Sequence, residues 1–403
     1  MKLKRLICLI TALSFVLSAC ACGAQKENNS GSAEDTEENQ TVVATVNGTD
    51  ITYGDFAEQM VTVEALYSAL SETLTAEEIN QKLNEQAKVI IENLISQVIL
   101  EQKAAEYNIS LGKEDERAAQ ETWIATKERI TASVKANYPD FKGKDLEALV
   151  AVALENMGIS EESVVESARK SALISKLREM LDAQVEPADE AQIQARYDQL
   201  LQEQRENFTQ SATSFESAAL AGTPLTYVPA DYRVIHEWDV SFDADVVALL
   251  KQLKEIDTKD DSTYEDMLAN EKSLLQNKVD EILAALSDGD FDTVYARYNS
   301  GESPAVNYVS SATTRFSPAY YDAAMSIAKK GDVANSIIEL ETGCKLLYWA
   351  DSMSAGVVPI AQLHDDIADM IFQEEKNENW KMVQALWRQE AQVTIQTDLI
   401  TYS

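Results

Sequence analysis

The residues from 86 to 107 carry one long amphipathic pattern, which constrains the fold more than any other stretch of the sequence. At the helical period of about 3.6 residues per turn, apolar side chains gather on one broad face and polar side chains gather opposite. The apolar face comprises Ala87, Ile90, Ile91, Leu94, Ile95, Val98 and Ala105. The polar face comprises Lys88, Glu92, Ser96 and Lys103. Ile99 and Leu100 fall outside the main band, so we expect this helix to contact more than one neighbour or to leave apolar surface for a ligand.

The composition indicates a folded protein with an acidic surface. A chain of 403 residues, 45% hydrophobic and 25% charged, can form two or three globular units. Its formal net charge is -34, from 34 basic and 68 acidic residues, and the body of the chain has no basic block. We therefore expect no nucleic-acid partner, because phosphate binding needs clustered lysine and arginine. With only two histidines, His236 and His364, we expect no metal site and no Ser-His-Asp chemistry, and no cofactor is implied.

The amino terminus has the pattern of a bacterial export signal. A basic segment, residues 1–5, precedes an apolar run, residues 6–17, that is too short to span a membrane comfortably. The run ends in Leu-Ser-Ala-Cys20, which resembles the bacterial lipobox. The resemblance implies that residues 1–19 are removed and that lipid on Cys20 holds the protein at the extracytoplasmic side of the bacterial cell membrane. A plain secretory signal is the alternative.

The residues that follow the lipobox, 20–40, are rich in Gly, Ser, Asn, Gln and Glu, with almost nothing apolar to bury. We expect a flexible acidic tether. Cys8 leaves with the signal peptide, so Cys22 and Cys344 are the thiols that remain beside the lipid-bearing cysteine. One lies in the tether and one lies far along the chain, and the sequence therefore implies no disulfide framework.

Regular structure is expected to begin at Thr41 with a β-hairpin. Two runs of β-branched residues flank Asn47-Gly48, a pair that supplies the positive φ values of a tight turn. Thr52, followed three residues later by Asp55, is expected to cap the next helix. From there to residue 205, apolar residues recur at helical spacing, so we expect an all-helical region.

Several short patterns in this region resemble the amino-terminal region of SurA/PrsA-type foldases. They lie at residues 43–56 (Val-Ala-Thr-Val-Asn-Gly onward), 91–103, 107–109, 157–160 (Met-Gly-Ile-Ser), 171–177, 185–190 and 195–198. In that family this region is a helical chaperone domain that cradles unfolded polypeptide. The resemblance implies such a domain over residues 41–206, with unfolded or newly exported polypeptides as its partners. Whether the chain also forms a homodimer stays open.

A compositional change separates this region from the next one. Residues 207–231 are rich in Ser, Thr, Ala, Gly and Pro without a clean period, and we expect a connector. A strand follows, on which Val234, His236, Trp238 and Val240 are predicted to point to one side. With the helical patterns and the final strand after it, residues 232–351 are expected to form a small α+β domain.

The order of patterns in this domain resembles a divergent peptidyl-prolyl isomerase of the parvulin type. The resemblance places catalytic side chains at His236, Thr342 and Lys345, and substrate-binding side chains at Tyr308, Phe316, Tyr320 and Met325. The sequence departs from the family pattern at two positions. Lys345 stands where the family has its second histidine, and Gly301 stands where it has Asp or Cys, with Glu302 as a shifted substitute.

The substitution at Lys345 leaves two functional hypotheses open. Prolyl isomerisation needs an apolar pocket and polar groups that favour the twisted amide, whose barrier is about 18–20 kcal/mol. An ammonium group donates hydrogen bonds and carries charge, so Lys345 cannot replace the second imidazole of a proton-sharing pair. Either the domain is a slow isomerase in which Lys345 polarises the prolyl carbonyl, or it is a degenerate scaffold attached to a chaperone. His236 is then a strand histidine without a catalytic role. A solute-capturing lipoprotein is a third hypothesis, but the parallel α/β lobes it needs are not indicated.

The carboxy-terminal residues, 352–403, carry a long helical pattern. The resemblance to SurA/PrsA-type foldases implies that this helix packs back on the chaperone domain. We expect Trp380 and Trp387 to lie near Leu94, and residues 393–395 to add a strand to the amino-terminal hairpin. The predicted fold is therefore mainly α, with a helical SurA-like domain completed by the C-terminal helix and a parvulin-like α+β domain inserted.

Overall fold

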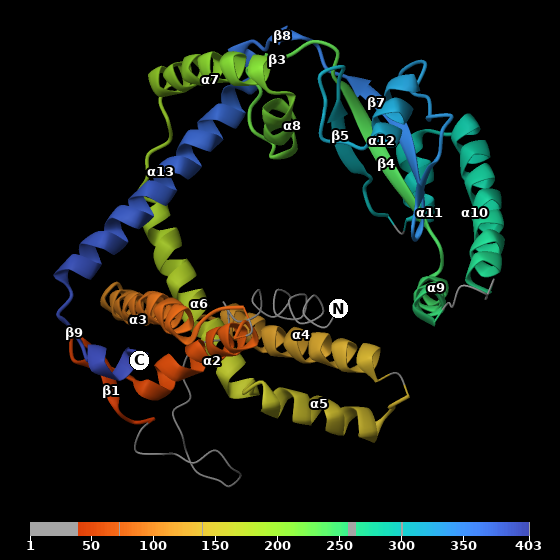
Figure 1. Cartoon of the computed structure of the whole chain (residues 1–403). Coiled ribbons are helices and arrows are strands. Elements are labelled where there is room, and N and C mark those ends of the chain that lie inside the picture. Colours follow the sequence, from red (N-terminus) through yellow and green to blue (C-terminus); the bar gives the residue numbers. More distant parts are fainter. Residues whose placement is uncertain (1–38, 72, 139, 257–262, 300, 403) are drawn as a thin grey trace. The chain divides into compact units, whose positions relative to one another are not determined.

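The computed structural model describes residues 39–71, 73–138, 140–256, 263–299 and 301–402 (Figure 1). The expected signal peptide, the lipid-bearing Cys20 and almost all of the expected tether lie outside these residues. Contacts divide the chain into two units. The first contains the chain up to Glu186 together with the residues from Glu374 onward, and the second is Pro187–Gln373. No helix within the described ranges is long and apolar enough to cross a membrane.

The first unit combines a small antiparallel sheet with helices. Its sheet has the order β2-β1-β9, so a strand from the carboxy terminus pairs with the amino-terminal hairpin, as the sequence predicts. Asn47 and Gly48 both have positive φ, 50° and 86°, as the tight turn between β1 and β2 requires. The elements are β1 (Val42–Val46), β2 (Thr49–Thr52), α2 (Tyr53–Ala69), α3 (Ala76–Glu106), α4 (Lys113–Asn137), α5 (Lys144–Asn156), α6 (Glu161–Asp182), β9 (Val393–Ile395) and the 3-10 turn η1 (Thr397–Ile400).

Reciprocal hydrogen bonds fix the starts of α2 and α3. Thr52 accepts from the backbone N–H of Asp55, while the Asp55 carboxylate accepts from the backbone N–H of Thr52 at 2.8 Å. Thr75 and Glu78 form the same arrangement before α3. Each pair satisfies backbone N–H groups that have no partner inside the helix, which confirms the predicted cap at Thr52.

The core of the first unit forms around α3. Most of the predicted apolar face is buried, with Val98 partly buried, and Ile99 and Leu100 are buried with it because this helix packs on α2, on the sheet and on α6. The prediction for Ala105 is wrong: it is exposed, and Ala104 is buried in its place. Near its C-terminal end the buried band of α3 turns toward Ile99 and Leu100, which leaves Ala105 outside the contact.

The carboxy-terminal helix completes this core. Trp387 is 5% exposed and belongs to the same cluster as Leu94, and Trp380 packs against that cluster. The rings of Tyr107 and Trp387 lie 6.1 Å apart. Two segments distant in the sequence therefore share one hydrophobic core, as predicted.

Helix α4 packs on α5 and α6, and its turn to α5 exposes aromatic side chains. Ile130 is buried in this packing, whereas Tyr138 is 52% exposed and Phe141 is 42% exposed. Their rings meet edge to face at 6.1 Å. Tyr138 is thus not a core residue, although its helical spacing from Ile130 predicts one.

The second unit contains a four-stranded antiparallel sheet of order β5-β4-β7-β6, with helices on both faces. The fold is therefore mainly α with an α+β insert, as expected. The elements are α7 (Glu190–Gln210), α8 (Ala212–Leu220), β3 (Tyr227–Val228), β4 (Arg233–Ser241), α9 (Ala244–Ile256), α10 (Thr263–Asp288), α11 (Phe291–Tyr298), β5 (Ala305–Val309), α12 (Pro318–Ser326), β6 (Ile338–Leu340), β7 (Gly343–Ser352), β8 (Gly356–Val357) and α13 (Ile360–Glu390), whose residues from 374 belong to the first unit.

Helix α7 groups with the second unit, although its sequence reads as the end of the helical region at residues 41–206. The reason is that Tyr197 and Leu200 pack on Ile367 and Ile371, in the first half of α13. The segment expected to be a connector, residues 207–231, contains α8 and β3. This segment has no clean apolar period, yet Phe215 on α8 is fully buried.

Candidate functional site

The two faces of the sheet divide the side chains of β4 into two groups. Trp238 and Val240 face α9, α10 and α11, while Ile235 packs with α12 on the other face. Successive strand residues point to opposite faces, so His236 lies on the same face as Trp238, and Glu237 lies on the same face as Ile235. The predicted alternation is confirmed, and it separates His236 from the face on which the rest of the polar network lies.

His236 sits among aromatic rings rather than in an open groove. Its ring centroid lies 5.5 Å from that of Phe291 and 6.2 Å from that of Tyr348, its partner across the β4–β7 ladder. Its Nδ1 is buried without a hydrogen bond and lies 3.8 Å from Asp292 Oδ1. Burial lowers the pKa of this imidazole, while the Asp292 carboxylate acts in the opposite direction. This environment favours a neutral histidine.

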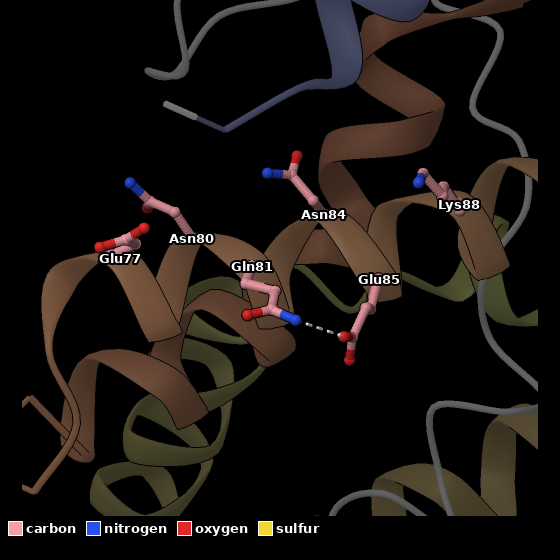
Figure 2. A pocket seen from close by; sticks show the side chains of 6 residues that line it. All are labelled: Glu77, Asn80, Gln81, Asn84, Glu85 and Lys88. Atoms are coloured by element: carbon pink, nitrogen blue, oxygen red, sulfur yellow. Dashed lines mark hydrogen bonds between the residues drawn. The ribbon is translucent and has the colours of Figure 1, made fainter.

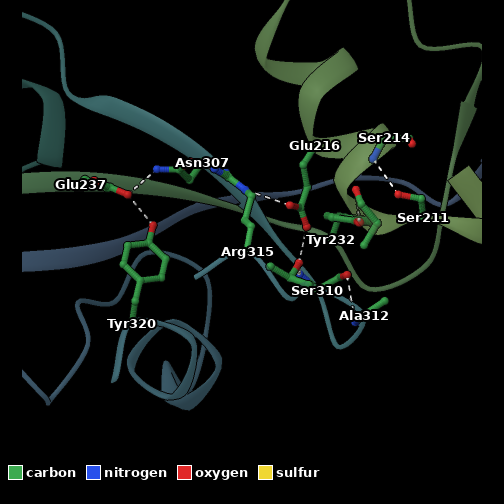
Figure 3. A network of polar contacts seen from close by, with 12 residues as sticks. Ser211, Ser214, Glu216, Tyr232, Glu237, Asn307, Ser310, Ala312, Arg315 and Tyr320 are labelled. Carbon is green, nitrogen blue, oxygen red and sulfur yellow. Dashed lines mark hydrogen bonds and ion pairs between the residues drawn. The ribbon is translucent and has the colours of Figure 1, made fainter. Parts of the chain in front are cut away.

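Glu237 is the centre of a polar network on the opposite face (Figure 3). Its Oε1 accepts hydrogen bonds from the Tyr320 hydroxyl, at 2.6 Å, and from the Asn307 amide. Its Oε2 forms an ion pair with Lys345, whose ammonium also lies 3.0 Å from the Asp239 carboxylate. The side chains of Glu237 and Lys345 are only 10% and 18% exposed. Each buried charge is therefore paired and hydrogen-bonded, as burial requires.

The setting of Lys345 limits what this ammonium can do. Burial alone would lower its pKa, but hydrogen bonds to Glu237 and Asp239 outweigh burial and raise it. The cation therefore stays protonated, and two carboxylates neutralise its charge. To polarise a prolyl carbonyl, Lys345 would first have to leave these partners, which costs electrostatic energy.

The predicted substrate-binding side chains fall into two clusters. Phe316 and Tyr320 stack at 4.0 Å with an interplanar angle of 14°, and Met325 packs in the same cluster at the end of α12. Tyr308 packs instead with Phe215 on α8, with ring centroids 6.2 Å apart. Burial, reinforced by the Glu237 hydrogen bond, raises the pKa of the Tyr320 hydroxyl, so this group remains a donor. The structure thus brings three of the four side chains together.

The remaining predicted positions lie at turns. Thr342 is exposed in the turn between β6 and β7, and its carbonyl accepts from the backbone N–H of Phe242 at 2.9 Å. The next residue, Gly343, has φ of 153°, and a Cβ there would lie 2.2 Å from the Val240 carbonyl oxygen. Only glycine fits this close crossing. Gly301 and Glu302 lie just after α11, and Glu302 is exposed.

A second buried charge ties α8 to the four-stranded sheet. Glu216 on α8 is 0% exposed, accepts a hydrogen bond from the Thr313 hydroxyl and forms an ion pair with Arg315 at 2.8 Å. Arg315 also donates to Asn307, which donates to Glu237 (Figure 3). A continuous set of polar contacts therefore runs from α8 to the centre of the sheet. Sequence reasoning missed this set, because it joins residues about 100 positions apart.

Two hollows in the surface differ in character. The hollow over α3 is lined entirely by polar side chains that project from one helix (Figure 2), namely Glu77, Asn80, Gln81, Asn84, Glu85 and Lys88. It is a solvated helix face without an apolar floor. The second hollow, of ≈ 330 Å³, lies where the α10–α11 turn meets the α12–β6 loop, and Phe291 and Tyr348 line it together with Asp290 and Asp332. No cluster of metal-ligating side chains occurs in the part of the chain that the structure describes.

Comparison with known proteins assigns the amino-terminal region. Residues 2–178 match the family described as the SurA-like N-terminal domain. The chain carries a SurA-like N-terminal domain. The resemblance to SurA/PrsA-type foldases that residues 43–198 indicate is thereby confirmed. A comparison with curated proteins gives no significant match.

Solved structures with some likeness include further SurA-like and PrsA proteins. A SurA-like chaperone of Campylobacter jejuni shares 10% identity with the chain, with 88% of this chain and 98% of that one covered and a TM-score of 0.33. The foldase protein PrsA of Lactococcus lactis shares 13%, with 90% and 97% covered and a TM-score of 0.28. PrsA of Bacillus subtilis shares 11%, with 91% and 100% covered and a TM-score of 0.27. Because these TM-scores are low, function is inferred from the SurA-like domain and from the side-chain geometry.

Proposed function

We propose that the protein is a chaperone for exported polypeptides, and that its parvulin-like domain has weak or lost peptidyl-prolyl isomerase activity. The SurA-like N-terminal domain is the observation that carries the chaperone function. In our proposal the protein acts on the extracytoplasmic side of the membrane, held there by lipid on Cys20. The lipobox-like Leu-Ser-Ala-Cys20 supports this location.

Exposed apolar side chains on the first unit support a client-binding role. Those at least half exposed are Val61, Val89, Ile124, Tyr138, Val152, Met382 and Leu386. Covering one such side chain with a client contributes up to about 1.5–3 kcal/mol. The exposed pair Tyr138 and Phe141 supplies rigid aromatic area at the turn between α4 and α5.

The environments of Lys345 and His236 support the proposal of weak or lost isomerase activity. Lys345 is neutralised by Glu237 and Asp239, and His236 faces the opposite side of the sheet among Phe291 and Tyr348. Neither group is free to stabilise a twisted prolyl amide next to the Phe316–Tyr320 stack. An active isomerase is the alternative, and that stack, a partly buried aromatic surface beside α12, is the observation in its favour.

Aggregation of a denatured client tests the chaperone function. Light scattering after dilution should fall as the protein is added, and should stop falling when protein and client are about equimolar, because each holding site takes one segment. The double variant Tyr138→Ser/Phe141→Ser should suppress scattering less than the wild type. Leu249→Ser/Leu274→Ser on the second unit, where the side chains are 43% and 55% exposed, is the matched control and should suppress scattering normally. Absence of suppression by the wild type would contradict the proposal.

Turnover of a proline-containing peptide tests the alternative. An isomerase that uses Lys345 to polarise the carbonyl should lose turnover in Lys345→Ala. Our proposal expects little turnover in the wild type and no further loss in this variant. The anchor is tested separately, by labelling with a radioactive fatty acid, which should mark the wild type and not Cys20→Ser.

A further inference from the structure

The hollow beside Tyr348 has the aromatic and acidic lining of a binding site, and neither the client-binding side chains of the first unit nor the Glu237 network is part of it. Its volume of ≈ 330 Å³ is enough for one long side chain. Phe291 and Tyr348 form its aromatic floor, with rings stacked at 4.2 Å and an interplanar angle of 10°. Leu283, Leu286 and Val333 add aliphatic walls. The hollow lies on the face of the sheet that carries His236, opposite the Glu237 network.

The rim of this hollow is acidic. Asp290 and Asp332 line it, and Asp292, in the first turn of α11, has its side chain 78% exposed. Lys329 Nζ lies 3.8 Å from Asp332 Oδ1, and Lys330 forms an ion pair with Asp351. Asp290 caps the start of α11 by accepting from the backbone N–H of Thr293, which leaves part of its charge facing outward.

The carboxylates act on the floor as well. Burial raises the pKa of the Tyr348 hydroxyl, and the charges of Asp292 and Asp290 raise it further, while Lys330 acts in the opposite direction. Asp290, Asp332 and the Tyr348 ring line the same hollow, so the carboxylates and the aromatic face can contact one bound group. An aromatic face under a negative potential attracts a cation, and an aliphatic stem can lie along the walls.

We propose that this hollow binds a basic side chain, arginine or lysine, from an extended segment of a client polypeptide. The inference rests on the proposed chaperone function and names the client chemistry that the second unit selects. The net charge of -34 draws basic segments toward the chain in general, and the hollow provides the specific contact. The hollow over α3 has no aromatic side chain in its lining, so it offers a basic side chain no cation–π contact.

The two histidines make the test site-specific. His236 contacts Phe291 and Tyr348, the floor of the hollow, whereas His364 lies on α13 between Glu190 and Asp365. The full chain, labelled at histidine, is titrated with a short glycine–serine peptide that contains one arginine, while the NMR signals of both rings are followed. We expect the His236 signal to shift to saturation and the His364 signal to stay in place. The same peptide with citrulline, which is neutral and nearly the same shape, should bind about fivefold more weakly or worse.

Charge-matched variants separate the hollow from the general acidic field. Asp290→Asn/Asp332→Asn keeps a helix-capping side chain and should weaken arginine-peptide binding about fivefold. Asp243→Asn/Asp245→Asn removes the same charge from the exposed start of α9 and should change it less than about twofold. Equal weakening in both variants, or an unmoved His236 signal, would overturn the inference. If the same protein still suppresses client aggregation, only the arginine site fails; loss of suppression as well would overturn the chaperone function.

Discussion

The isomerase question depends on Lys345 and its partner Glu237. Removing one member of a buried ion pair leaves the other charge without compensation, so Lys345→Met should lower the free energy of unfolding of the second unit by about 3–5 kcal/mol. The double variant Glu237→Leu/Lys345→Met should lose clearly less than the sum of the two single variants, because no charge is left unpaired. Urea denaturation followed by tryptophan fluorescence measures both.

Lys272→Met is the matched control for this cycle. Lys272 also forms an ion pair with a glutamate, Glu339, but both side chains are well exposed. Exposed pairs contribute little, so this variant should unfold close to the wild type. A Lys345→Met protein as stable as the control would show that the Glu237–Lys345 pair does not hold the sheet and is free for other roles.

The two histidines should titrate on opposite sides of the ordinary value of 6.5. Burial lowers the pKa of His236, and hydrogen bonds to Asp365 and Glu190 raise the pKa of His364. Neutral His236 therefore contributes stability above about pH 6.5 that is lost as the pH falls. Charged His364 contributes stability at low pH that is lost as the pH rises through its raised pKa. NMR titration of the labelled rings measures both values, and the reverse order would contradict the described environments.

The alternation of residues along β4 predicts on which face of the sheet His236 and Glu237 lie. Val234, Trp238 and Val240 are apolar, so the strand period puts His236 on their face of the sheet and Glu237 on the opposite face. The partner of Lys345 could not be read in the same way. It depends on the β4–β7 register, which pairs Asp239 with Lys345 across a connection of about 100 residues. No local pattern in the sequence reports such a register.

Among the helices, α13 contributes to the hydrophobic clusters of both units. It supplies Trp387 to the core of the first unit, while Ile367 in its first half packs on α7 in the second. Trp387→Ala should therefore destabilise the first unit by about 3–5 kcal/mol, as large-to-small changes in a core do. Met382 lies on the same helix and is 66% exposed, so Met382→Ala should change the unfolding transition little. Equal effects of the two substitutions in thermal unfolding would contradict the shared core.

Elements with strong local signals could be predicted, and those held by distant contacts could not. The β1–β2 turn, the cap at Thr52 and the helix α3 all follow from neighbouring residues. Helix α8 escapes prediction because its main contacts, Glu216 with Arg315 and Phe215 with Tyr232, join it to residues beyond its own segment. Tertiary contacts there override a weak local preference.

At the scale of the molecule, the chain uses distant segments to complete one domain. Strand β9 pairs with β1, and the C-terminal residues of α13 enter the core formed by α3. The resemblance to SurA/PrsA-type foldases implies this arrangement from sequence alone, and the pairing of β9 with β1 and the burial of Trp387 confirm it. In our proposal, the inserted sheet domain adds a surface whose acidic and aromatic groups select clients.

Refolding of a client whose slow phase is limited by proline isomerisation separates the holding of clients from the catalysis of isomerisation. The protein is added in increasing amounts, and the aggregated fraction and the rate constant of the slow phase are measured in the same samples. We predict that aggregation falls until the protein is about equimolar with the client, while the slow phase keeps its rate at catalytic amounts. If the slow phase accelerates at those amounts and loses the acceleration in Lys345→Ala, the protein is an active isomerase and not a chaperone with weak or lost isomerase activity.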